Sequence, residues 1–321
     1  MQRPDSRILI AGAAWRVWRF IVPALLAAGY LRESVTILRR STEAELHPGL
    51  EGIRVVTSLD ALEGERFDMT MNCTAAAAML DVQEGLVRRF PHARHFCDTP
   101  TFSDPADAVR ALRLGLKRMH SLEDWPLMPN LAYFAARMRK SRNRAELRIE
   151  HFGILTHFLS LYRTIHGDWH PFSRGLVRSE GLVSASPARG RSVLFRYRKN
   201  LPLAKLALQT TDCLLEDFHE VEPSPHNDPE VFYRVATEGQ VSYLQGATTI
   251  SSTPIEAVWI RSFEPFSDRK NVHELDKFIG LVRLFRAIAA GGAARPYGYL
   301  ASVRDNLTSL KLSSGERSLL L

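Results

Sequence analysis

The chain has 321 residues, of which 45% are hydrophobic and 24% are charged. These proportions are close to those of globular proteins, and they exclude a disordered chain, a collagen-like fibre and a coiled coil. Because domains usually contain about 100–200 residues, the length predicts two domains, each large enough to bury a core.

The 42 Lys and Arg residues outnumber the 35 Asp and Glu residues, which gives a formal net charge of +7. Such an excess favours anionic partners, such as nucleotides or carboxylated small molecules. The alternative is a solvated basic surface. The basic residues are dispersed along the chain, so we expect no nucleic-acid-binding arm.

The three cysteines, Cys73, Cys97 and Cys213, lack the spacing of a zinc site or of a disulfide framework. The longest apolar run, residues 20–31, contains Pro23 and is shorter than the roughly 20 residues of a membrane span. Arginines precede this run, which is untypical of a signal peptide. We therefore expect a cytoplasmic protein that has no membrane partner.

The first part of the chain alternates between strand and helix patterns. A β-branched run at residues 7–12 ends in Gly12, and a helical stripe with a kink at Pro23 follows at 15–28. Further strands are predicted at 35–38, 55–56, 69–73 and 95–97, with helices at 79–90 and 105–114. This order predicts a parallel sheet, that is, a Rossmann dinucleotide-binding domain over residues 1–122, with its ligand at the carboxyl ends of the strands.

The second part, residues 123–321, predicts an α+β domain with a mostly antiparallel sheet. A hairpin is predicted at residues 231–245, where two alternating runs flank Glu238-Gly239. The other predicted elements are strands at 146–150, 193–197 and 257–263 and helices at 130–139, 155–166, 275–285 and 300–310. The α/β fold class thus combines this domain with the Rossmann domain.

The turn after the first strand reads Gly12-Ala13-Ala14-Trp15-Arg16-Val17. In a dinucleotide site, a turn of the pattern G-x-G-x-x-G places the pyrophosphate on the N–H groups at the start of the helix. Only the first of these glycines is present. The turn is therefore a candidate cofactor site, and an ordinary βα turn without a nucleotide is the alternative.

The end of the second strand reads Arg39-Arg40-Ser41 and has no acid. In such folds an acid at this point holds the ribose of NAD, whereas arginine accommodates the 2′-phosphate of NADP. Two guanidinium groups and a hydroxyl suit a phosphate dianion, so NADP is the expected cofactor and NAD is less favoured. A solvated arginine pair is the alternative.

Several segments, taken in order over nearly the whole chain, resemble the Gfo/Idh/MocA oxidoreductases. They are the opening strand and turn, Asn72-Cys73-Thr74, residues 95–100, the helix near 153–167, and the helix that stops at Gly291-Gly292. The resemblance implies a nicotinamide cofactor that contacts Cys73 and Thr74. It also implies a homodimer or homotetramer.

The chain departs from that family where the chemistry is expected. Thr99 stands at the position of the family's catalytic lysine. The family's His-x-x-Asp motif corresponds to His157-x-x-Ser160, so the histidine is kept and the acid is replaced by serine. Gly153 stands at the position of a further acid upstream of that motif. Related biliverdin reductases and thiazolinyl imine reductases also lack the lysine. The resemblance therefore implies an NADPH-dependent reductase of an imine or conjugated double bond in a small, anionic metabolite. The alternatives are a sugar or polyol dehydrogenase and an inactive protein that binds a nucleotide or a partner.

His157 is the first candidate for proton transfer, because imidazole exchanges protons near neutral pH. The alternative is a histidine of the core. Asp98, at a strand end beside Thr99, is a second candidate if its carboxyl is desolvated, although it could instead cap a helix. Tyr162 and His151 rank behind these two.

Two further groups of residues carry weaker signals. His166, Asp168 and His170 lie close together in the sequence but lack the spacing of a metal site, so we expect no metal. Arginines at positions between 174 and 198 favour either contact with an acidic substrate or a solvated face.

Overall fold

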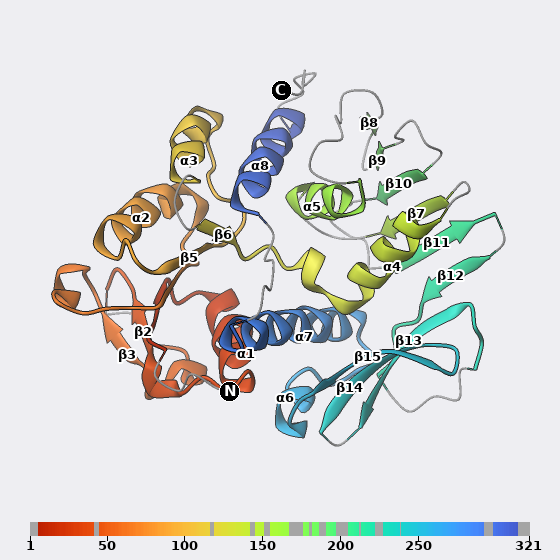
Figure 1. Cartoon of the computed structure of the whole chain (residues 1–321), viewed down its shortest axis with the longest axis horizontal. Helices are drawn as coiled ribbons and strands as arrows, with labels where there is room; N and C mark the ends of the chain where they lie inside the picture. The colour runs from red at the N-terminus through yellow and green to blue at the C-terminus, as the bar shows by residue number, and fades with distance from the viewer. Residues whose placement is uncertain are drawn as a thin grey trace. The chain divides into compact units, whose positions relative to one another are not determined.

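The computed structural model describes residues 6–41, 45–115, 119–141, 145–150, 155–166, 176–179, 182–185, 191–196, 205–211, 213–221, 227–237, 239–291 and 298–313. The chain forms two compact units, which are drawn in Figure 1. Unit 1 comprises Met1–Glu123 and Leu281–Arg317, and unit 2 comprises Asp124–Gly280 and Ser318–Leu321.

The sequence predicted one domain from residue 123 onwards, whereas Leu281–Arg317 belong to the first compact unit. Helix α8 (Tyr299–Ser313) packs on unit 1, where Tyr299 and Val303 share a buried cluster with Phe102. The Nδ2 of Asn306 also donates to the carbonyl oxygen of Phe102 at 2.8 Å. The C-terminal helix thus completes the core of the first unit.

Unit 1 is built on a sheet of six parallel strands in the order β3-β2-β1-β4-β5-β6. The strands are β1 (Ile8–Ala11), β2 (Val35–Leu38), β3 (Arg54–Val56), β4 (Met69–Asn72), β5 (Arg94–Cys97) and β6 (Met119–Ser121). Every residue of β1 and β4 is buried, as expected for strands covered on both faces. The predicted Rossmann-type sheet is confirmed, and β6 is a strand that the sequence did not predict.

The helices of unit 1 follow the strands. They are α1 (Val22–Ala27), α2 (Ala76–Arg89), α3 (Ala108–Leu114), α8 and the last part of α7 (Arg269–Ala289). Leu86 and Phe90, at the end of α2, pack with Leu9 and Ala11 of β1 in one apolar cluster. Burying a side chain of this size stabilises the fold by about 1.5–3 kcal/mol.

A π-helical segment, Val17–Ile21, precedes α1 in the first helix. Pro23 stands at the start of α1, where it has no N–H to donate and where its ring would clash with a carbonyl group one turn earlier. The wider π turn accommodates this ring, so the irregularity expected at Pro23 takes the form of a π segment.

Unit 2 is built on a mixed sheet of nine strands in the order β15-β14-β13-β12-β11-β7-β10-β9-β8. The strands are β7 (Ala145–Glu150), β8 (Leu176–Ser179), β9 (Leu182–Ala185), β10 (Arg191–Arg196), β11 (Lys205–Thr210), β12 (Leu214–Asp217), β13 (Val231–Thr237), β14 (Gln240–Gln245) and β15 (Thr248–Pro254). Among the described strands of this second sheet, only the pairs β7–β10 and β12–β13 are parallel. The predicted, mostly antiparallel sheet is confirmed.

The helices of unit 2 are α4 (Pro129–Lys140), α5 (Leu155–His166), α6 (Ala257–Arg261) and the first part of α7. The strand predicted at residues 257–263 is wrong, because α6 occupies it. Pro254 ends β15, and the N–H of Ile255 makes the last bond to Gly239. The residues that follow form the short helix α6, in which only Ile260 is buried.

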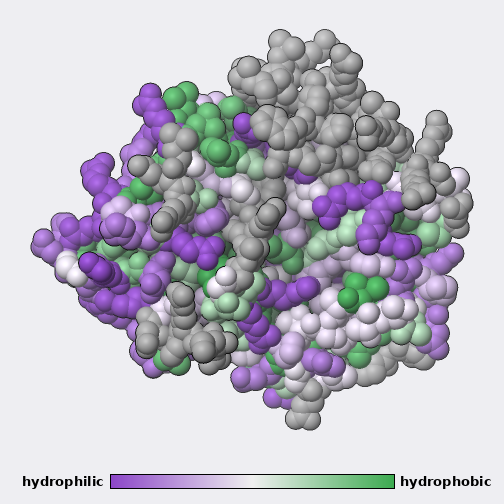
Figure 2. All heavy atoms as spheres, in the orientation of Figure 1, coloured by the Kyte–Doolittle hydropathy of each residue, from purple (hydrophilic) through white to green (hydrophobic). Residues whose placement is uncertain are grey.

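Figure 2 shows the hydropathy of one face, where a hydrophobic patch lies over α3. Val109 and Leu112 of α3 are exposed. None of the helices in the described part of the chain is long and apolar enough to cross a membrane.

Candidate active site

Gly12 lies directly after β1, against the end of β4. Its φ of +109° is in the left-handed region that favours glycine, and a Cβ here would lie 2.7 Å from the carbonyl oxygen of Cys73. The strand order reverses between β1 and β4, which is where open parallel sheets bind ligands. Burial raises the pKa of the Cys73 thiol, so this residue offers a ligand its backbone and not a thiolate.

The predicted phosphate turn opens into the first helix. Ala14 and Trp15 are exposed there, and Trp15 meets Phe20 edge to face with ring centroids 5.0 Å apart. The N–H of Val17 donates to the carbonyl oxygen of Ala14 at 2.8 Å. The amide groups that precede this bond start the helix, where N–H groups lack an intrahelical partner and suit a phosphate. Val17, at the position of the third glycine, is fully buried.

Arg16 ties this turn to the ends of β5 and β6. Its Nε lies 2.8 Å from Oδ2 of Asp98, and its Nη2 donates to the carbonyl oxygen of Leu122 at 2.8 Å. A guanidinium at this distance stabilises the ionised form of the carboxyl group. The ion pair therefore gives Asp98 an ordering role and speaks against its predicted role as a proton donor.

Thr99 stands where the resembled family has its lysine. Its Oγ1 donates to Oε2 of Glu123 at 2.9 Å, and Glu123 is itself buried. The N–H of Glu123 donates to Oγ of Ser121 at 3.1 Å. A neutral hydroxyl paired with a carboxylate thus stands where the resembled family has a cation.

Thr74, the candidate cofactor contact after β4, is fixed by Asn72. The N–H and Oγ1 of Thr74 donate to Oδ1 of Asn72 at 3.2 and 2.7 Å. The Nδ2 of Asn72 donates in turn to the carbonyl oxygen of Met79 at 2.8 Å. This loop is therefore held rigidly between β4 and α2.

The predicted phosphate-binding arginines lie at the carboxyl end of β2. The N–H of Arg39 donates to the carbonyl oxygen of Val56 at 3.0 Å, which extends the sheet by one residue. Arg39 and Ser41 are half-buried, whereas Arg40 is exposed. Gly12 N–H donates to Leu38 at 2.8 Å, so Arg39 and the phosphate turn belong to the same edge of the sheet.

His157 lies on α5 in unit 2. Its ring stacks on Trp125 with centroids 5.5 Å apart and an angle of 17° between the planes. One ring nitrogen lies within 4.8 Å of a carboxylate oxygen of Asp124, which is fully buried. Nζ of Lys277 lies 3.6 Å from Oδ2 of the same Asp124. His157 is half-buried, so it combines fixed neighbours with access from outside.

The two other residues of α5 that the sequence singled out are Tyr162 and Ser160. Tyr162 is buried 6.3 Å from the ring of Phe158, and burial raises its pKa, which favours a role in the core. Ser160 stands at the position where the resembled family has an acid. Its Oγ donates to the carbonyl oxygen of His157 at 2.7 Å. His151, Gly153 and the histidines and arginines between residues 166 and 198 lie outside the described side chains.

Asp124 and Lys277 were missed by reasoning from the sequence. Asp124 belongs to an acidic pair with Glu123, which follows the unpredicted strand β6 after one residue, Leu122. Lys277 lies on the long amphipathic helix α7, where a lysine is ordinarily solvated. An acidic pair at the end of a parallel strand was the one available signal.

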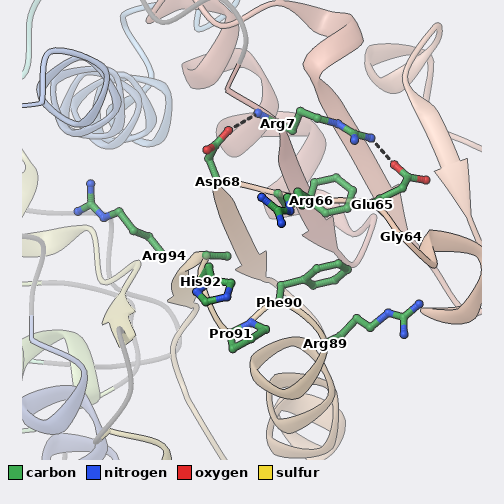
Figure 3. A pocket seen from close by; sticks show the side chains of 12 residues that line it. Arg7, Gly64, Glu65, Arg66, Asp68, Arg89, Phe90, Pro91, His92 and Arg94 are labelled. Carbon is green, nitrogen blue, oxygen red and sulfur yellow. Dashed lines mark hydrogen bonds and ion pairs between the residues drawn. The ribbon is translucent and has the colours of Figure 1, made fainter.

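A groove of about 760 Å³ in unit 1 is drawn in Figure 3. It lies where β1, β4 and β5 begin, with Arg7, Asp68 and Arg94 in its lining. The N–H of Arg7 donates to Oδ2 of Asp68, and its guanidinium pairs with Glu65. Since dinucleotides bind at the carboxyl ends of such strands, we do not assign the cofactor to this groove.

The chain is similar to several solved dehydrogenase structures. Levoglucosan dehydrogenase, in complex with NADH and levoglucosan, shows 11% identity and a TM-score of 0.61, with 98% of each chain covered. KijD10, a 3-ketoreductase from Actinomadura kijaniata in complex with NADP, shows 14% identity and a TM-score of 0.59, also with 98% of each covered. A myo-inositol dehydrogenase from Corynebacterium glutamicum shows 13% identity and a TM-score of 0.56, with 97% of this chain and 95% of that chain covered.

No protein-family model and no curated protein matches the sequence. The likeness to the solved structures extends over both units, and it agrees with the resemblance drawn from the motifs. The expected fold is thereby confirmed: this chain shares the two-domain fold of these solved dehydrogenases.

Proposed function

We propose that this protein is an NADP-dependent oxidoreductase that binds its cofactor on unit 1. The left-handed turn at Gly12 and the exposed helix start that follows suit a pyrophosphate. Arg39, Arg40 and Ser41 suit the 2′-phosphate, and the rigid loop at Thr74 suits the nicotinamide end. The bound cofactor would supply the hydride. The chain's own residues orient the reactants and deliver the proton.

We further propose that the reaction is the reduction of an imine or conjugated double bond. The observation that carries this proposal is the bond from Thr99 to Glu123 at the position of the family's lysine. Oxidation of an alcohol builds negative charge on oxygen, which a cation stabilises and a neutral hydroxyl facing a carboxylate does not. Reduction of an electron-poor carbon requires a single proton donor, the role proposed for His157.

A sugar or polyol dehydrogenase is the second candidate. It is favoured by the similar solved structures, which are named as inositol and levoglucosan dehydrogenases. It would require a group other than Thr99 to stabilise the developing alkoxide.

A substrate panel separates the two candidates. We expect no measurable NADP⁺-dependent oxidation of inositol, glucose or similar polyols, because the cation is missing. Thr99→Lys alone should not install this activity, since Gly153 and Ser160 still lack the family's carboxylates. Turnover of a polyol by the unchanged protein at about 1–10³ s⁻¹ would instead establish the dehydrogenase.

Cofactor preference depends on the arginines at the end of β2. Arg39→Asp should weaken NADPH binding about 10- to 150-fold and affect NADH much less, because a charge-assisted hydrogen bond contributes about 1.5–3 kcal/mol. Titration calorimetry measures both affinities. Arg66→Asp is the matched control, because Arg66 is an exposed arginine in the groove at the opposite edge of the sheet.

Equal affinity of the unchanged protein for NADPH and NADH would contradict the assignment of the 2′-phosphate to Arg39. Hydride transfer from labelled NADPH to a metabolite would exclude the inactive alternative. A homodimer or homotetramer remains a prediction, which light scattering on the purified chain checks.

A further inference from the structure

We propose that Asp124 is a positioning residue that fixes the tautomer and orientation of the His157 ring, and that Lys277 holds Asp124 in its ionised form. The kinetic consequence rests on the proposed function, whereas the arrangement of the three side chains does not. All three residues belong to unit 2 but come from separate elements: the segment after β6, α5 and α7.

The burial of Asp124 requires a charged neighbour. A carboxylate with no exposed surface is strongly disfavoured unless a counter-charge compensates for its lost hydration. Lys277 supplies this counter-charge, because its Nζ lies 3.6 Å from Oδ2 of Asp124 and its side chain is itself mostly buried. The pair therefore places an ionised, accepting oxygen in the interior beside α5.

Two neighbours, Trp125 and Asp124, restrict the position of the His157 ring. Trp125 covers one face of the ring, and a carboxylate oxygen of Asp124 lies within 4.8 Å of a ring nitrogen. A negative charge on one side favours the tautomer whose N–H points toward it, which leaves the other nitrogen for exchange with a substrate. Among the described side chains of α5, His157 and Thr164 are half-buried and the others are buried, and these two residues share one face seven residues apart.

The arrangement replaces a group that α5 no longer supplies. Ser160 occupies the position of the family's acid, but its hydroxyl bonds to the helix backbone at His157. A carboxylate near the imidazole comes instead from Asp124, on a different element.

A metal ion between Asp124 and His157 is the competing interpretation, because carboxylate and imidazole are also metal ligands. The ammonium group of Lys277 is already held at 3.6 Å from the carboxylate. A divalent cation bound to the same carboxylate would be repelled by this charge. The structure thus favours positioning over metal binding.

Nitrogen NMR on the full-length protein with ¹⁵N-labelled histidine tests the proposal directly. The His157 signals are assigned by their loss in His157→Gln. We expect one dominant tautomer in the unchanged protein, and a mixture or the opposite tautomer in Asp124→Asn, whose amide can donate toward the ring. Lys277→Arg should keep the native tautomer and Lys277→Met should lose it, which provides a second test if Asp124→Asn does not fold.

The kinetic arm separates this proposal from the proposed function. Asp124→Asn should lower kcat about 10²- to 10⁴-fold with little change in KM, as expected when a proton-transferring histidine has the wrong tautomer. A tautomer change without loss of activity would support the positioning and contradict His157 as the proton donor. An unchanged tautomer in Asp124→Asn, or His157 signals that shift with equimolar Zn²⁺ in the unchanged protein, would overturn the positioning.

Discussion

Replacing His157 by glutamine should lower kcat and kcat/KM together by about 10²- to 10⁴-fold, the usual contribution of a general acid. Glutamine fills a similar space beside Trp125 but cannot deliver a proton. Binding of substrate and cofactor should change little, since the lost interaction belongs to the transition state. Steady-state kinetics with NADPH and the substrate found in the panel measure both parameters.

The matched control for this variant is Thr164→Ala. Thr164 shares the accessible face of α5 with His157, and its hydroxyl donates to the helix backbone at Ser160. We expect no more than a small change in turnover from this control. If His157→Gln lowers the thermal midpoint while turnover per folded molecule stays the same, His157 is a core residue. The proton would then have to come from another group, since Asp98 is paired with Arg16 and Tyr162 is buried.

The fold was largely predictable because its signals are local. The strand that ends in Gly12, the apolar run at residues 69–73 and the stripes of the helices each report burial of a short segment on one or two faces. Alternation of such segments allows few topologies, and the parallel sheet follows from it. The alternating runs around Glu238-Gly239 fix the β13–β14 hairpin for the same reason.

Membership of α8 in unit 1 was not predictable from these signals. An apolar stripe shows that a helix is buried but not against which partner, and Tyr299 packs on Phe102, nearly two hundred residues earlier. Strand β6 escaped prediction because its three residues include a histidine and a serine.

Some residues of the candidate site could be predicted from the sequence, whereas others could not. The turn at Gly12 and the arginines after β2 are adjacent in sequence to the strands that place them, so spacing identifies them. Asp124 approaches His157, and Lys277 approaches Asp124, only through the packing of separate elements. No spacing rule connects three residues whose proximity is decided by tertiary structure. The pairing of Asp98 with Arg16 was hidden for the same reason.

Unit 2 also contains a fully buried network of charged side chains, which come from separate elements and are brought together by tertiary packing. Nη1 of Arg234 donates to Oδ1 of Asp217 at 2.7 Å, and its Nε donates to Oδ1 of Asp276 at 2.9 Å. Asn130 donates to Asp217 and Tyr243 donates to Asp276, each at 2.9 Å. The guanidinium of Arg234, on β13, therefore pairs with one carboxylate on β12 and one on α7. These ion pairs link the three elements.

Arg234→Met should lower the free energy of unfolding of unit 2 by about 3–5 kcal/mol, because it leaves two buried carboxylates without their counter-charge. Chemical denaturation followed by circular dichroism measures this loss. Arg148→Met is the control in the same unit, since Arg148 is an exposed arginine paired with Glu146, and it should cost no more than about 1 kcal/mol. Equal losses in the two variants would show that the buried network does not hold the sheet to α7.

The loss of unfolding free energy in Arg234→Met should also depend on pH. Burial already raises the pKa of Asp276, while Arg234 lowers it, so removal of Arg234 raises this pKa further. A carboxyl whose pKa is higher in the folded than in the unfolded state is protonated preferentially on folding, and stability then falls as the pH rises through the folded value. The deficit of Arg234→Met relative to the unchanged protein should therefore be smallest near about pH 4 and should grow toward about pH 8. A deficit that stays constant over this range would mean that the loss comes from packing around the missing guanidinium and not from the stranded carboxylates.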